Sequence, residues 1–263
     1  MSYRRIACLS TEAVETLYLL GAENCIAGIS GFTARPARAR KEKPKVSGFS
    51  SAKIDRILAV EPDLVIAFSD LQAEIVRDLV RAGVEVHVFN QRDLAGILRM
   101  IRALAALVGR AEKGEHLVVD LQTRLQMARS RAGALAQRPR VYFEEWNDPL
   151  ISGIRWVSEL IEVAGGVDCF AEESRRQAAR ERIIADPAEV IRRAPDIIIG
   201  SWCGKKFRPE QLRARPGWVA VPAVRDGQLH EIKSADILSP GPAAITEGLA
   251  RIERVIANWA VRA

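Results

Sequence analysis

The sequence has no apolar run that approaches the ~18–20 residues needed to cross a bilayer. The longest candidate covers residues 97–108 and carries Arg99 and Arg102 within it. We therefore expect no insertion into a membrane. No two cysteines have the CxxC spacing, which disfavours a structural zinc site and indicates reduced, mostly buried thiols. The four cysteines are Cys8, Cys25, Cys169 and Cys203.

Catalytic motifs are also missing. The sequence contains no GxGxxG, no Walker-type glycine loop and no HExxH. Each of the three histidines, His87, His116 and His230, stands alone without a nucleophile beside it in sequence. Glu144 and Glu145 are neighbours on a predicted strand, where consecutive side chains point to opposite faces, so they cannot form an acid–base pair. We predict a protein that is not an enzyme and has no catalytic cofactor and no bound metal.

Charge and the amino terminus bear on partners and location. The net charge is +6, but the basic stretches 35–45 and 175–182 lack the interleaved aromatics of a nucleic-acid groove. We therefore predict no nucleic-acid partner. Residues 1–5 lead straight into a predicted strand, with no room for the apolar core of an export signal, which is ~7–15 residues long. This favours a cytoplasmic protein, or a periplasmic one if a leader has been removed from the natural chain.

The sequence does contain an internal repeat. Residues 57–66, ILAVEPDLVI, match residues 190–199, VIRRAPDIII, and each reads as a helix, a Pro-Asp turn and a buried parallel strand. Residues 15–22 match residues 159–166 in the same order, each as a helix that stops at a glycine. Two matches in one order indicate a duplicated α/β lobe.

The repeat predicts an α/β fold in which two parallel-sheet lobes are joined by a long backbone helix. We assign an N-terminal lobe to residues 1–90, the bridging helix to 91–138 and a C-terminal lobe to 139–263. The first lobe is predicted to have strands at 4–9, 25–29, 63–68 and 84–89 and helices at 12–20, 51–60 and 70–82. The second has strands at 140–145, 196–200 and 229–232 and helices at 155–164, 187–193, 209–214 and 241–261. Apolar residues at helical spacing extend over ~45 residues of the bridge, with one kink near Gly109 and Gly114.

Aromatic residues make up only 6% of the chain, but three of the five tryptophans, Trp146, Trp156 and Trp202, follow predicted strands. Ligands of open parallel sheets bind beyond the carboxyl ends of the strands, so two lobes facing each other would form a ligand cleft. Trp146 and Trp202 are better suited to the wall of this cleft than to a core. Trp156 fits equally well as an anchor for the helix at 155–164.

Several segments together carry a resemblance to a known family. They are IACLS at 6–10, GIS at 28–30, KIDRIL at 53–58, PDLVIA at 62–67, AGV at 82–84 and EVAGG at 162–166. In this order they are similar to segments of the helical-backbone periplasmic binding proteins of ABC importers. Within that family the chain looks most like the vitamin B12-binding branch.

The resemblance implies a protein that holds its ligand between two lobes without altering it. By position it implies ligand contacts at Phe32, Arg35, Phe68, Trp146, Trp156 and Trp202. By residue type alone, Cys203 beside Trp202 is a further ligand contact, as a soft ligand of a metal or cofactor. Corrinoid binders of the family line the cleft with aromatic rings, which favours a cobalamin-like corrinoid. Arg35 and Arg155 leave a ferric siderophore, haem or another metal chelate open.

The family also docks on a membrane permease through one acidic residue in each lobe. The resemblance points to Asp55 in the first lobe and, through the internal register, to Glu189 in the second, with Glu210 as a rival. We expect a monomer that serves an ABC permease. Two alternatives stay open: a cytoplasmic protein that sequesters, senses or delivers the ligand, and a cytoplasmic enzyme acting on a bound metal chelate through Cys203 or Glu144.

Overall fold

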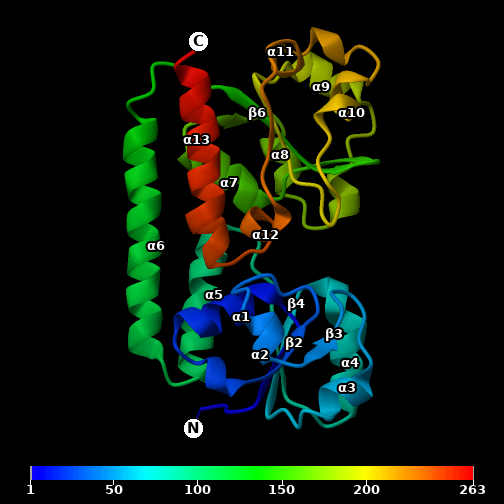
Figure 1. Cartoon of the computed structure of the whole chain (residues 1–263), viewed down its shortest axis with the longest axis vertical. Helices are drawn as coiled ribbons and strands as arrows, with labels where there is room; N and C mark the ends of the chain where they lie inside the picture. The colour runs from blue at the N-terminus through cyan, green and yellow to red at the C-terminus, as the bar shows by residue number, and fades with distance from the viewer. Residues whose placement is uncertain (1, 263) are drawn as a thin grey trace. The chain divides into compact units, whose positions relative to one another are not determined.

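The computed structural model describes residues 2–262. The chain divides into two compact units, residues 1–121 (unit 1) and residues 122–263 (unit 2), each with its own sheet (Figure 1). Because the boundary falls inside the segment 91–138, the predicted bridge is shared between the two units.

Unit 1 is built on five parallel strands in the order β3-β2-β1-β4-β5. They are β1 (Ile6–Cys8), β2 (Ile26–Ser30), β3 (Lys45–Ser47), β4 (Leu64–Phe68) and β5 (Val86–Phe89). The helices are α1 (Thr11–Leu19), α2 (Ala39–Glu42), α3 (Ile54–Leu58), α4 (Ala73–Arg81) and α5 (Leu94–Leu107), with short 3-10 helices at Glu23–Cys25 and Asp70–Gln72. Strands β1 and β4 are buried along their whole length, as their continuous apolar sequence predicts for central parallel strands.

The bridge is not one long helix. Helix α5 ends at Leu107, and Gly109 takes a left-handed φ of 66° before α6 (Ala111–Ala132) begins. The chain then turns back, so that the start of α6 packs against α5. Two contacts show this: Arg102 pairs with Glu115 at 2.7 Å, and a Cβ on Gly114 would lie 2.3 Å from that of Ala105. The expected ~45-residue rod with one kink is therefore wrong: α5 and the start of α6 form a helical hairpin, and α6 alone passes from unit 1 into unit 2.

Unit 2 has a mixed sheet in the order β10-β9-β6-β7, with β8 beside β6. The strands are β6 (Arg140–Asn147), β7 (Leu150–Ser152), β8 (Val167–Asp168), β9 (Ile197–Gly200) and β10 (Leu229–Glu231). Strand β7 is antiparallel to β6 and is absent from the strands that the sequence predicts. The helices are α7 (Arg155–Val163), α8 (Ala171–Ser174), α9 (Ala188–Arg193), α10 (Pro209–Arg213), α11 (Pro222–Arg225), α12 (Ser234–Ile237) and α13 (Leu249–Ala260). Short 3-10 helices lie at Ala179–Arg182 and Trp218–Ala220, and a π-helix at Ala244–Gly248 precedes α13.

The duplication predicted from the sequence is present in the sheets. Strands β2, β1, β4 and β5 lie side by side in the same order as β8, β6, β9 and β10. At the start of β4 the Asp63 carboxylate accepts the backbone N–H groups of Arg4 and Arg5, at 2.7 and 3.0 Å. At the start of β9 the carboxylate of Asp196 accepts the N–H of Arg140 at 2.8 Å. The repeated Pro-Asp dipeptide therefore ties each of these strands to the first strand of its own sheet.

Candidate functional site

Two exposed aromatic rings lie at the carboxyl end of the unit 1 sheet. Phe32 follows β2 and is 66% exposed, and Phe49 follows β3 and is 36% exposed. A Cβ on Gly48 would lie 3.9 Å from the Phe32 ring, so the two strand-end loops adjoin. The sequence predicted a site at Phe32 but missed Phe49, because the three-residue strand before it has only one buried side chain, Val46.

Buried Gln72 links the loop after β3 to two other strand ends of unit 1. Its Oε1 accepts the N–H of Phe68 at 2.9 Å, and its Nε2 donates to the carbonyls of Leu9 and Phe49, at 3.2 and 2.7 Å. One side chain thus links the ends of β1, β3 and β4. The Phe68 ring itself is buried, with the Arg92 guanidinium 5.4 Å from its centroid. Phe68 therefore stands at the predicted strand end but presents little surface to a ligand.

Unit 1 also contains a buried carboxylic acid, which follows strand β1. Glu12, in the first turn of α1, is 3% exposed, and Gln91 Nε2 donates to its Oε1 at 3.4 Å. Burial raises the pKa of Glu12 to about 7, although hydrogen bonds from Thr11, Ser10 and Gln91 pull the pKa downward. Nothing in the sequence pattern distinguishes this glutamate from the exposed ones.

Within β6, unit 2 contains a buried carboxylate, Glu144. Glu144 is fully buried; Arg215 donates to both of its oxygens, at 2.5 and 3.0 Å, and Trp202 Nε1 donates at 2.9 Å. The Tyr142 hydroxyl completes the network at 3.2 Å. Glu145 points to the other face of the strand and pairs with buried Arg182 at 2.7 Å. The prediction that the two glutamates cannot act as a pair is confirmed.

The Trp202 ring does not line a surface. It is 4% exposed, belongs to the core of unit 2 and meets Phe207 edge-on at 5.1 Å. The expectation that Trp202 presents an exposed ring is therefore wrong, and the reason is the indole N–H, which reaches the buried Glu144. Trp156 is also buried and donates to the carbonyl of Ile237 at 2.8 Å, which favours its reading as a helix anchor.

Trp146 is the aromatic residue of unit 2 that keeps a partly accessible ring at a strand end. Its Nε1 donates to the carbonyl of Asp148 at 2.8 Å, and Lys205 Nζ lies 3.9 Å from the ring centroid. Cys203, in the same loop as Lys205, is exposed as a residue, but its thiol group is partly shielded from water. This partial burial, and to a lesser extent the negative charge of Glu145, raises the pKa of the thiol. An exposed Cys203 departs from the prediction of mostly buried thiols.

The predicted arginines differ in their surroundings. Arg35 is half-buried in the loop after β2. Arg155 is exposed at the start of α7 and pairs with Glu159 at 3.0 Å. It lines a cavity of about 400 Å³ between α7 and α8, together with Ser158, Glu159, Glu162, Ala171, Ser174 and Arg175. The roles of these residues toward a ligand, and the cleft predicted between the lobes, stay predictions.

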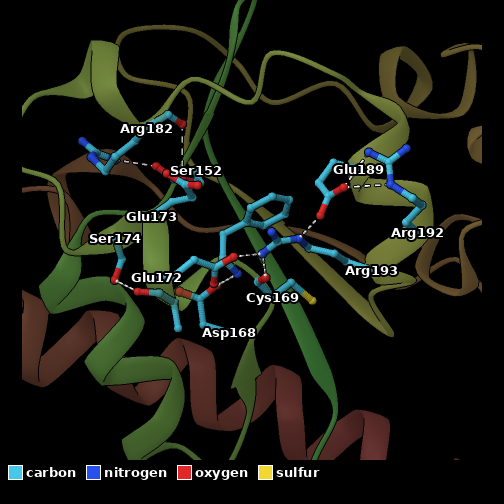
Figure 2. Close-up of polar contacts among 12 residues, drawn as sticks. Ser152, Asp168, Cys169, Glu172, Glu173, Ser174, Arg182, Glu189, Arg192 and Arg193 are labelled. Atoms are coloured by element: carbon cyan, nitrogen blue, oxygen red, sulfur yellow. Dashed lines mark hydrogen bonds and ion pairs between the residues drawn. The ribbon is translucent and has the colours of Figure 1, made fainter.

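Each of the two predicted docking acids is the second residue of its helix, Asp55 in α3 and Glu189 in α9. Asp55 lies exposed in α3, and no ion pair to it occurs within residues 2–262. Glu189 in α9 is held by Arg192 at 2.6 Å and Arg193 at 2.6 Å (Figure 2), and these contacts lower its pKa. Arg193 also pairs with Glu172 at 2.5 Å and stacks 4.2 Å from the Phe170 ring centroid. Glu210 is exposed in the first turn of α10.

Two kinds of feature are absent from residues 2–262. Within residues 2–262 no group of three or more His, Cys, Asp or Glu side chains is placed to hold a metal ion. Over the same residues, no helix combines the length and the apolar character that a membrane span requires.

Comparison with known proteins links this architecture to a family. The sequence profile of the periplasmic binding protein family matches residues 6–235. The vitamin B12-binding protein of Vibrio parahaemolyticus is 27% identical over 192 residues, which cover 71% of this chain and 69% of that protein. The structure of the periplasmic vitamin B12 binding protein BtuF of Vibrio cholerae matches with a TM-score of 0.78 at 21% identity, over 98% of both chains. The periplasmic heme-binding protein RhuT of Roseiflexus sp. RS-1 matches with a TM-score of 0.83 at 22% identity, over 99% of this chain and 100% of that one. These matches confirm the predicted two-lobe α/β fold.

Proposed function

Because this chain belongs to the periplasmic binding protein family, we propose that it binds a cobalamin-like corrinoid and delivers it unchanged to an ABC importer. The observation that carries the proposal is the 27% identity to a vitamin B12-binding protein over about 70% of both chains. The proposed role has no chemical step, so the ligand leaves in the form in which it entered.

The strand-end rings support this ligand class. The Phe32 ring is 66% exposed, and covering it with a flat apolar ligand would lower the free energy by removing apolar surface from water. Phe49 adds a second ring in the adjoining loop, and Trp146 offers an indole in unit 2. A corrinoid presents a broad macrocycle with amide groups at its edge, so aromatic packing and a few hydrogen bonds suffice to hold it.

Half-buried Arg35 favours a second candidate. A guanidinium grips planar carboxylates, which haem and many ferric chelates carry and cobalamin lacks. The structural match to a heme-binding protein is consistent with this candidate. The two candidates differ in the charge of the ligand and are therefore separable by a direct titration.

The test is isothermal titration calorimetry, supported by absorbance and tryptophan fluorescence. The probes are cyanocobalamin, dicyanocobinamide, hemin and a ferric carboxylate siderophore, each added to purified protein. We expect one-to-one saturation by the corrinoids and recovery of the cobalamin with an unchanged mass and spectrum.

Each outcome decides between the candidates. Saturation by hemin or the siderophore, without any signal from a corrinoid, would show that the ligand is an anionic metal chelate rather than a corrinoid. No saturable signal from any probe at micromolar protein would overturn both. A chemically altered ligand would show an enzyme rather than a carrier.

A further inference from the structure

A small pocket beside the edge strand of unit 1 is lined mainly by basic and hydroxyl residues. It has a volume of about 350 Å³ and lies between β3 and α3, which pack against each other (Figure 1). Its lining residues are Lys45, Val46, Ser47, Gly48, Ser51, Ala52, Lys53 and Arg56. None of the residues predicted to contact the ligand lines it.

Three cations without acidic partners surround this pocket. Lys45, Lys53 and Arg56 are all exposed, and none forms an ion pair within residues 2–262. Many arginines of this protein are paired: Arg38, for example, contacts Glu23 and Glu42. Like charges held around one small cavity repel one another, so an anion in the pocket would be stabilised by all three at once.

Hydroxyl groups complete the lining. Ser47 Oγ is buried and has no hydrogen-bond partner among residues 2–262, which is unfavourable for a polar atom removed from water. The loop that carries Ser51 is fixed in place: Gly48 N–H donates to the carbonyl of Ser51 at 2.7 Å, and Ser47 pairs with Ala52 in an antiparallel bridge. The pocket therefore offers hydrogen-bond donors on a fixed backbone as well as positive charge.

We propose that this pocket binds a phosphate group. A phosphomonoester carries close to two negative charges and three acceptor oxygens, which match three cations and adjacent hydroxyl donors better than a single carboxylate does. The group can belong to free phosphate or to a lipid headgroup, and the chemistry of the pocket is the same for both. The inference does not depend on the identity of the ligand bound at the strand ends.

The experiment is a titration of the full chain with inorganic phosphate, followed by amide chemical shifts in two-dimensional NMR. We expect saturable shifts at Ser47, Gly48 and Ser51. Arg56→Gln and Lys53→Gln each remove one cation and should weaken binding by about tenfold, the loss expected for one charge-assisted hydrogen bond. Ser47→Ala keeps the charge and tests the hydroxyl separately.

Arg81→Gln is the matched control, because Arg81 is an exposed, unpaired cation of unit 1 outside the pocket. It should leave phosphate binding unchanged. Co-sedimentation with vesicles that contain phosphatidic acid, whose headgroup is a phosphomonoester, identifies the source of the phosphate, with phosphatidylcholine vesicles as the neutral reference. Lipid binding that needs Lys53 and Arg56, with no shift by free phosphate, assigns a headgroup. No response to either probe, or an equal loss in Arg81→Gln, overturns the proposal.

Discussion

The indole Nε1 of Trp202 donates to Oε1 of Glu144 across 2.9 Å, and both side chains are buried in unit 2. A buried carboxylate is tolerated only when its oxygens are satisfied, and here Trp202 shares that task with Arg215. The tryptophan at this strand end is therefore a structural residue, although its position in sequence resembles that of a ligand contact.

We expect Trp202→Phe to lower the free energy of unfolding by about 1–3 kcal/mol, because one hydrogen bond to a buried charge is lost. Affinity for the corrinoid should stay within about threefold of the original. Urea denaturation followed by circular dichroism measures the first effect and calorimetry the second. A large loss of affinity with unchanged stability would return Trp202 to the ligand site.

Trp146→Phe and Phe32→Ala should show the opposite pattern. Each removes part of an accessible ring, so stability should change by less than about 0.5 kcal/mol. Affinity should fall about 10- to 100-fold for Phe32→Ala, since a ring covered by ligand contributes about 1.5–3 kcal/mol. The controls are Trp259→Phe on α13 and Leu19→Ala, an exposed apolar residue at the far end of α1 from the strand-end loops. The proposed binding surface would be contradicted if Trp259→Phe lowered the ligand affinity as much as Trp146→Phe, or Leu19→Ala as much as Phe32→Ala.

Arg215→Met tests the ion pair of Glu144 more severely. The substitution leaves a buried carboxylate without its two guanidinium donors, and removal of one partner from such a pair costs about 3–5 kcal/mol. Arg213→Met, at the exposed last residue of α10 and two residues before Arg215, is the matched control and should cost less than about 0.5 kcal/mol. A small effect of Arg215→Met in urea denaturation would mean that water reaches the carboxylate.

Sequence reasoning found the elements that hydrophobic periodicity marks and missed those that long-range contacts create. The Pro-Asp repeat predicted β4 and β9 correctly. Asp63 contacts the backbone within the sheet of unit 1, and Asp196 contacts it within the sheet of unit 2. Strand β3 was missed, since three residues with one buried side chain carry no period. The site was predicted by position along the strands, which places Phe32 and Trp146 but says nothing of burial. The interior position of Trp202 depends on Glu144, 58 residues away, and no local pattern encodes that contact.

Glu12 should make stability depend on pH. Its pKa is about 7 in the folded protein and 4.5 as the ordinary value, so the folded state binds the proton more tightly than the unfolded state. The stabilising contribution of the protonated form is complete below pH ~4.5 and is lost as the pH rises through 7, a total of about 3 kcal/mol. Glu12→Gln keeps a neutral side chain and should be more stable than the original at pH 8 but not at pH 5. Denaturation curves at both pH values measure this; a constant difference between the two proteins would contradict it.

The docking acids give the sharpest test of the importer role. Asp55→Ala and Glu189→Ala should each reduce uptake of labelled cobalamin in cells that depend on this protein, without changing affinity in calorimetry. The reason is that each removes one exposed or partly exposed carboxylate from a helix surface and touches no strand-end ring. Glu189→Ala should have the smaller effect, because Arg192 and Arg193 already neutralise that carboxylate and compete with any cation of a partner.

Glu112→Ala on α6 is the control for surface charge, and Glu210→Ala tests the rival position in unit 2. Loss of uptake in Glu210→Ala with normal uptake in Glu189→Ala would move the second docking point to α10. Normal uptake in all four variants, with intact ligand binding, would separate the protein from a permease. The binding role would then belong to a carrier or sensor of the same ligand, because the strand-end rings proposed to hold the ligand lie outside the docking helices.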